Sequence, residues 1–255
     1  MRIFLTGFRF QLRVAWSSPD TLQIWVTAPL FTLVFMAIAE HAERPDLAPF
    51  AIVSPTLMSL WTLALFIAGE LIGDERRSGT LEALIAVPAR LSTLVIGRIC
   101  AVTTLGLLSF AEAWLVAGLV FDRWLAVRHP LPFVLCLVVT ALAMAATATI
   151  FSPLFILMPS ARTVQNTLTY PFYLLSGVLI PVAMLPFWLR PASHLIFLSW
   201  SGDLLRDSLA APAPHDVAAR LTAVLALGVA SHLIGMALLH RVLRRVRRLG
   251  TLSHS

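Results

Sequence analysis

The chain has 255 residues, of which 58% are hydrophobic and only 13% are charged. Soluble domains carry about 45–50% apolar and about 25% charged residues, so this chain has more apolar surface than one soluble core can bury. The composition therefore excludes a soluble globular enzyme and predicts an all-α, polytopic membrane protein. The 19 lysine and arginine residues are all arginine. A chain without lysine cannot form a Walker A loop, because that motif needs its lysine to reach the nucleotide phosphates.

The first 16 residues predict a helix that lies in the membrane interface. At about 100° per residue, Arg2, Arg9 and Arg13 fall on one narrow stripe, and apolar side chains cover most of the remaining surface. The alternative is an imperfect transmembrane helix, in which three central arginines would each be costly. We assign residues 1–19 to the interfacial helix, residues 20–248 to a transmembrane domain and residues 249–255 to a cytoplasmic tail.

Six segments with few charges are long enough to cross a bilayer as helices. They are Thr21–Ala39, Leu47–Gly69, Ile99–Phe121 with Glu112 inside it, Leu131–Ala161, Thr163–Leu189 and Leu221–Leu239. An even number puts both termini on one side, and a cytoplasmic N-terminus places 13 of the 19 arginines in the cytoplasm, as the positive-inside rule requires. Pro171 and Pro181 should kink or break the fifth helix, and a short outer re-entrant helical segment is expected after it.

A charged stretch between the second and third spans predicts a helix of about two turns beneath the membrane. Gly79 and Pro88 bracket this helix, and Glu82 lies in its first turn, where the helix dipole favours a carboxylate. The apolar face of the helix consists of Leu81, Leu84 and Ile85, at spacing i, i+3 and i+4. Such a helix suits docking into a groove on another protein, and a plain solvated loop is the alternative.

Two runs of residues carry a resemblance to a known family. The first is Glu75…Gly79-Thr80-Leu81-Glu82…Pro88…Gly97-Arg98, and the second is Ser176-Gly-Val-Leu-Ile-Pro181…Leu185-Pro186-Phe-Trp188-Leu-Arg190. The first resembles the signature of ABC-2 type exporter permeases, including their drug-resistance branch, and the second is similar to that family's fifth span and outer return. One departure is the outer segment, where Ser193–Leu198 stands in place of the Asn-Pro and aromatic residue that members often have.

The resemblance implies a half-transporter that works with an ABC ATPase present in two copies. A second permease chain, identical or different, completes the pathway in the lipid bilayer, and nucleic acid is not an expected partner. ATP and Mg belong to the ATPase, so this chain is expected to hold no cofactor, no metal and no catalytic residue. We expect a bacterial inner membrane protein with both termini in the cytoplasm. The expected ATPase-coupling residues are Glu75, Arg77, Gly79, Thr80, Leu81, Glu82, Leu84, Ile85 and Pro88.

Four residues are candidates for a translocation path: Glu112, Asn166, Tyr170 and Tyr173. Glu112 lies well inside a predicted span, and ionisable groups at that depth are functional candidates. A structural hydrogen bond or a water-facing outer position is the alternative for it. The other three belong to the most polar membrane stretch, where they either line the path or tie helices together by hydrogen bonds.

These features predict a permease that moves a hydrophobic or amphiphilic substrate (a drug, a lipid or a glycan-linked molecule) out of the cytoplasm. Two alternatives would act without an ATPase: a proton-coupled secondary carrier, and an intramembrane enzyme that uses Glu112 or His232. Secondary carriers usually show inverted internal repeats, which are not apparent in this sequence.

Overall fold

The computed structural model describes residues 19–77, 108–157 and 161–249, together with residues 5, 7–9, 12–13, 101 and 104. Within these ranges all regular structure is helical. Segments this apolar can satisfy their backbone hydrogen bonds inside a bilayer only as helices or closed barrels. The predicted all-α class is therefore confirmed. The predicted docking helix between Gly79 and Pro88, most of the interfacial helix and the last six residues lie outside the described residues.

The helical elements follow the charge-poor segments of the sequence. In chain order they are α2 (Pro19–His41), η1 (Pro45–Leu47), α3 (Ala48–Arg77), α6 (Leu108–Phe121), α7 (Pro130–Leu157), α8 (Ala161–Leu175), η2 (Val182–Met184), α9 (Arg190–Ser193), α10 (Phe197–Leu209) and α11 (Val217–Leu249). By length and composition, Pro45–Leu65, Pro130–Phe151 and Val217–Val242 can each cross a membrane, and Trp25–His41 and Leu108–Phe121 are shorter apolar helices. The six-span count remains a prediction.

The fifth predicted segment divides into a helix and a return. Helix α8 ends at Leu175, and its 15 residues cover about 22 Å, less than the hydrocarbon core of about 30 Å. The Ser176 amide still donates to the Phe172 carbonyl at 2.9 Å, and Gly177 then adopts a φ of +73°. Glycine takes this left-handed conformation without steric strain, which is why helices often end beside it. The chain then passes through η2 and α9 into α10.

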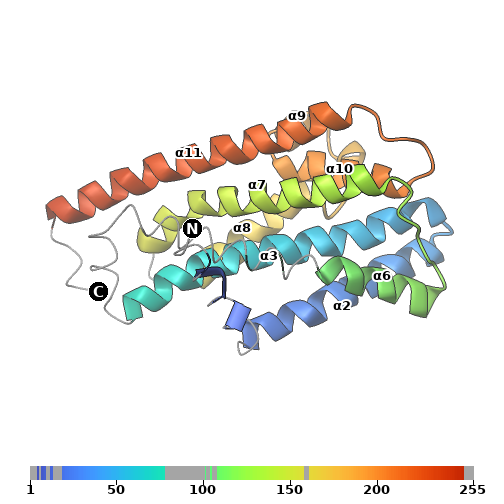
Figure 1. Cartoon of the computed structure of the whole chain (residues 1–255), viewed down its shortest axis with the longest axis horizontal. Coiled ribbons are helices and arrows are strands. Elements are labelled where there is room, and N and C mark those ends of the chain that lie inside the picture. The colour runs from blue at the N-terminus through green and yellow to red at the C-terminus, as the bar shows by residue number, and fades with distance from the viewer. Residues whose placement is uncertain are drawn as a thin grey trace.

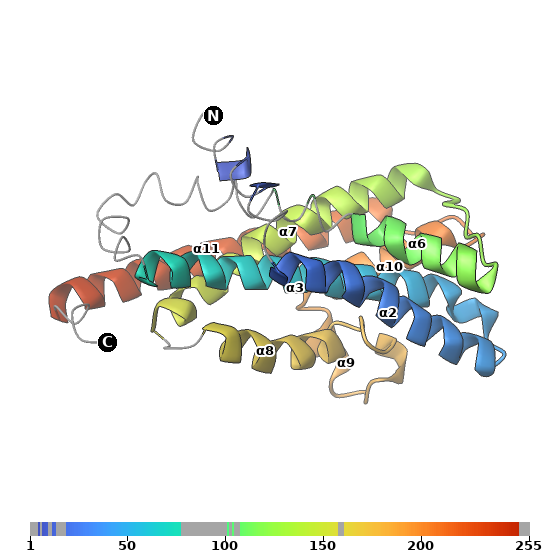
Figure 2. The same cartoon turned by 90° about the horizontal axis from the view of Figure 1, so that it is seen from below.

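The long helices run lengthwise along the molecule (Figures 1 and 2). Residues 42–47, 122–129 and 210–216 connect α2 to α3, α6 to α7 and α10 to α11, and all three connections lie at the right in Figure 1. We call this the loop end. The C-terminal ends of α3 and α11 lie at the opposite end, which we call the tail end.

Helix α3 forms the centre of the bundle, where it contacts α2, α6, α7, α8 and α10. Every residue from Ala51 to Trp61 is buried. The Trp61 ring stacks on Phe172 of α8 with centroids 3.8 Å apart, and it meets Phe151 of α7 edge-on at 5.9 Å. Each such aromatic pair contributes about 0.5–1.5 kcal/mol beyond its buried area. These rings therefore hold α7 and α8 against the central helix.

Helices α7 and α11 approach each other closely through glycines. A Cβ atom added at Gly228 would lie 2.9 Å from the Cα of Ala143, and one added at Gly235 would lie 2.7 Å from the backbone nitrogen of Ile150. His232 lies between the two glycines, and its Nδ1 is 3.3 Å from the Oγ1 of Thr149. Small residues and interhelical hydrogen bonds are the usual means by which helices associate in membranes. His232 thus makes a helix-packing contact.

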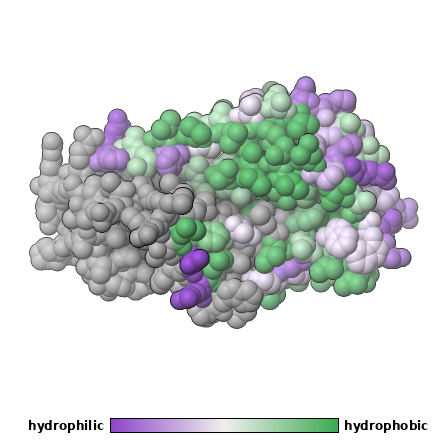
Figure 3. Space-filling model, viewed as in Figure 1, coloured by the Kyte–Doolittle hydropathy of each residue, from purple (hydrophilic) through white to green (hydrophobic). Residues whose placement is uncertain are grey.

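The outward faces of several helices are apolar. The exposed residues include Val26, Leu30, Val34 and Ile38 on α2, Leu131, Val134, Leu135, Val138 and Leu142 on α7, and Leu225, Val229, Leu233, Ile234 and Leu238 on α11. Figure 3 shows a broad apolar area over α7 and α11, with hydrophilic residues gathered at the loop end. An apolar surface this extensive faces lipid or a partner in a functional protein. The chain is a helical membrane protein.

Candidate functional site

Helix α8 differs from the other outer helices because its open face is polar. Asn166, Thr167 and Tyr170 are exposed along one side, and the Tyr170 side chain is 67% exposed. A helix face that meets lipid exposes apolar residues, since lipid offers no partner to an amide or hydroxyl group. The outward face of α8 is therefore suited to water or to another polar surface. Two of the four path candidates, Asn166 and Tyr170, share this face.

Tyr173 lies on the opposite side of α8, buried against α3. Its hydroxyl donates to the carbonyl oxygen of Met58 at 2.7 Å and lies 2.6 Å from the Oγ1 of Thr62. Only 2% of the residue is exposed. Both hydrogen bonds join α8 to α3, so this geometry favours the helix-tying alternative for Tyr173 over a position on an open path.

Glu112 lies on the outward face of α6. The buried side of this helix consists of Ser109, Ala113, Ala117 and Gly118. Glu112 is half-buried and shares the opposite side with the exposed Leu108, Leu115 and Leu119. Its carboxylate makes no hydrogen bond or ion pair with the described part of the chain. The structure therefore does not bring Glu112 together with Asn166 and Tyr170 of α8 within a single cluster.

The predicted coupling segment follows α3 at the tail end. Glu75 and Arg77 lie in the last turn of α3, and the other coupling residues fall in the undescribed stretch 78–100. The last turns of α11, which contain the arginines of Arg241–Arg248, lie at the same end (Figure 1). A common end for both segments is what a shared cytoplasmic location requires.

The loop end carries ion pairs in the described part of the chain. They join Arg44 to Asp46, Arg123 to Glu40, Arg206 to Asp203 and Arg220 to Asp207. The hydrogen bonds that Arg44 donates to Asp46 raise the pKa of the Arg44 guanidinium further above its ordinary value, so Arg44 stays charged. The exposed pairs of Arg44 and Arg123 contribute little to stability, because water screens them. Their concentration indicates that the loop end meets water.

Sequence reasoning missed Arg206, which contacts the turn that follows α8. Its Nη1 donates to the carbonyl oxygen of Gly177, and its guanidinium lies 5.1 Å from the centre of the Phe50 ring on α3. One side chain of α10 therefore contacts both the end of α8 and the central helix. Nothing in the local sequence singles out this arginine, because its partners lie 29 residues away along the chain or on another helix.

An all-helical bundle with apolar flanks, one polar outer helix and charged connections defines a polytopic membrane protein. The family model of the ABC-2 type transporter matches residues 4–210. The chain therefore belongs to the ABC-2 type transporter family, which confirms the resemblance predicted from the sequence. Nodulation protein J of Rhizobium leguminosarum bv. trifolii is 29% identical to this chain over 167 residues. That match covers 65% of this chain and 63% of the relative, so it spans less than two thirds of the relative's length.

Proposed function

We propose that this chain is the membrane permease of an ATP-driven exporter whose ATPase is a separate subunit. Membership of the ABC-2 type transporter family supports a role in transport. The observation that carries the proposal is the polar outward face of α8, on a chain whose other outer helices expose apolar residues. A transport path needs such a face, because a substrate with polar groups cannot cross hydrocarbon without hydrogen-bond partners.

In this proposal a second permease chain covers the polar face of α8. The path then runs between the two chains, with Asn166 and Tyr170 as lining residues. Tyr173 fixes the orientation of α8 from behind, through its hydrogen bonds to α3. The cargo is a hydrophobic or amphiphilic molecule, since the outward face of α8 also exposes Leu174 beside Tyr170.

The coupling step is assigned to the segment after α3. Leu81, Leu84 and Ile85 dock on the ATPase, which binds ATP and Mg, and Glu75 and Arg77 extend this contact at the end of α3. Closure of two ATPase subunits would move the segment and tilt α3. Because α3 contacts most of the other helices, such a tilt would be transmitted to α8 and change access to the path. The tail end then faces the bacterial cytoplasm.

The first test is purification of the tagged full chain in mild detergent from membranes that contain a co-expressed ABC ATPase. We expect the ATPase to co-purify and its rate of ATP hydrolysis to depend on the chain. The double substitution Leu81→Asp with Leu84→Asp should abolish co-purification while the chain still inserts. Ala126→Asp, an exposed position of the loop end, is the matched control and should change nothing. If the double variant still binds the ATPase normally, Leu81 and Leu84 do not dock on it.

The second test addresses α8. Asn166→Leu and Tyr170→Leu should each lower ATP-dependent transport in membrane vesicles by about tenfold or more, with normal expression and thermal stability. Thr222→Leu places the same side chain at an exposed polar position of α11 and should leave transport unchanged. Transport that persists in vesicles without any ATPase would instead support the secondary carrier.

A further inference from the structure

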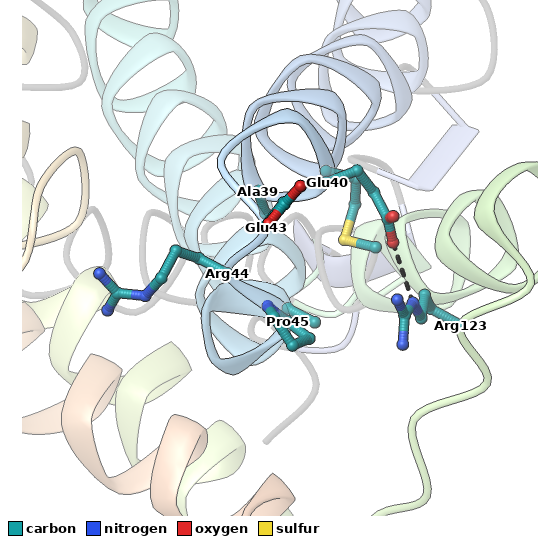
Figure 4. A pocket seen from close by; sticks show the side chains of 8 residues that line it. Ala39, Glu40, Glu43, Arg44, Pro45 and Arg123 are labelled. Atoms are coloured by element: carbon teal, nitrogen blue, oxygen red, sulfur yellow. Dashed lines mark hydrogen bonds and ion pairs between the residues drawn. The ribbon is translucent and has the colours of Figure 1, made fainter.

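A pocket of about 280 Å³ lies at the loop end, between the end of α2 and the connection that follows α6. Four apolar residues, Met36, Ala39, Pro45 and Ala48, line it together with four charged ones, Glu40, Glu43, Arg44 and Arg123. Figure 4 shows Glu40 and Arg123 directed toward each other, with Arg44 directed away from them. Pockets for drug-sized ligands begin at about 300 Å³, so this one suits a small head group.

The charged groups of the pocket are only partly paired with one another. Arg123 donates through Nε to Glu40 at 2.9 Å, and its two terminal nitrogens make no hydrogen bond to the described residues. Arg44 is occupied by Asp46, which accepts from its Nε and Nη2. The Glu43 carboxylate has no ion-pair partner in the described ranges. The pocket thus offers the two terminal nitrogens of Arg123 as hydrogen-bond donors and the Glu43 carboxylate as an acceptor.

Glu43 occupies an unusual backbone position for a glutamate. Its φ is +53°, and the Arg44 amide donates to the Ala39 carbonyl at 2.9 Å, which closes the end of α2 in the manner of a Schellman motif. Glycine is the ordinary residue at such a position, because a side chain is strained there. A carboxylate at a helix C-terminus also opposes the helix dipole, which favours a cation. A cationic ligand at this helix end would offset the unfavourable charge of the Glu43 carboxylate.

We propose that this pocket binds the phosphoethanolamine head group of a membrane lipid. The primary ammonium would donate to Glu43 and to the second carboxylate oxygen of Glu40, at the negative end of the α2 dipole. The phosphate would accept from the terminal nitrogens of Arg123. The acyl chains would lie against the exposed apolar end of α6, where Leu119 and Val120 directly precede the connection that contains Arg123.

The lining predicts which head groups are rejected. A choline group has no N–H to donate, and quaternary ammonium ions are otherwise bound by aromatic side chains; none of the lining residues is aromatic. A glycerol head group carries no cation for Glu43. The pocket should therefore prefer phosphatidylethanolamine to both phosphatidylcholine and phosphatidylglycerol.

Native mass spectrometry of the purified full chain in detergent tests this preference. We expect the first molecule of dioleoyl phosphatidylethanolamine to bind at least about fivefold more tightly than the choline or glycerol lipid, the ratio that one exposed ion pair of about 1 kcal/mol provides. Glu43→Gln should remove the preference, and Arg123→Gln should weaken the binding of all three lipids because each carries the phosphate. Asp216→Asn and Arg220→Gln are matched controls at the same end of the bundle and should keep the preference, since Asp216 also has a φ of +53° and Arg220 is also ion-paired.

Glu43→Gly separates binding from folding. Glycine relieves the positive φ while it removes the carboxylate, so this variant should be at least as stable as the parent chain and still lose the preference. Competition by soluble glycerophosphoethanolamine distinguishes the two sources of the head group. Effective competition assigns the site to a soluble compound with the same group, and its absence assigns the site to the lipid. Equal binding of all three lipids, or an unchanged preference in Glu43→Gln, would overturn the proposal.

Discussion

The close contact between α7 and α11 predicts that a glycine-to-alanine substitution in α11 lowers the stability of the protein, the opposite of its usual effect in a helix. Replacement of glycine by alanine inside a helix normally stabilises it by about 0.5–1 kcal/mol. At Gly235, however, the new Cβ would lie 2.7 Å from the backbone nitrogen of Ile150 and from the backbone carbon of Thr149. Backbone atoms cannot rotate away, so the helices must move apart, and overpacking of this kind costs about 1–3 kcal/mol. We therefore expect Gly235→Ala to destabilise the protein by about 1 kcal/mol.

The thermal unfolding midpoint of the purified chain, followed by intrinsic fluorescence, measures this effect. A loss of about 1 kcal/mol corresponds to a decrease of about 2–4 °C in a chain of this size. Gly202→Ala in α10 is the matched control, because its Cβ would meet side-chain atoms of Arg206 and Leu57, at 3.1 and 3.4 Å, and no backbone atom. Its midpoint should stay the same or rise. A higher midpoint for Gly235→Ala would show that α7 and α11 do not approach as closely as described.

Three further substitutions test individual contacts. Tyr173→Phe should lower the unfolding midpoint by the equivalent of about 1–2 kcal/mol, because it removes both hydrogen bonds between α8 and α3, whereas Tyr170→Phe at the exposed position should not. Arg206→Lys keeps the charge but loses the planar guanidinium that reaches Gly177 and Phe50, so hydrogen exchange of residues 176–196 should become faster, and unchanged exchange would contradict this role. Glu112→Gln should leave the midpoint unchanged, since the described residues offer this carboxylate no partner, and normal export by this variant would remove Glu112 from the mechanism.

The positions of the helices could be predicted from the sequence because they depend on local chemistry. Charge-free stretches long enough to cross a bilayer can be read directly from the sequence, and α2 and α7 begin and end within four residues of the predicted bounds. Helices α3 and α11 also begin within four residues of theirs, but they continue to Arg77 and Leu249, beyond the predicted ends at Gly69 and Leu239. The end of α8 cannot be predicted from the apolar stretch, because the stretch continues to Leu189 while the helix ends at Leu175. The stop depends on the turn at Gly177 and on Arg206, which comes from a different helix.

The orientation of α8 could not be predicted from its own residues. Tyr170 and Tyr173 belong to the same polar stretch, and the sequence predicts the same role for both. The structure separates them, because Tyr173 reaches Thr62, a residue 111 positions away, while Phe172 stacks on Trp61. The pocket at the loop end could not be predicted from local sequence either, because Glu43 and Arg123 come from different connections. Such features arise only when distant segments pack together.

The central claim is that the segment after α3 couples this permease to an ATPase, and site-specific photo-crosslinking in membranes tests it most directly. A photoreactive amino acid at position 84 of the full chain should form an ATP-sensitive adduct with the co-expressed ABC ATPase, and one at position 126 of the loop end should form none. An adduct from position 126 in place of position 84, or labelling of position 84 only from the outer face of the membrane, would contradict the account.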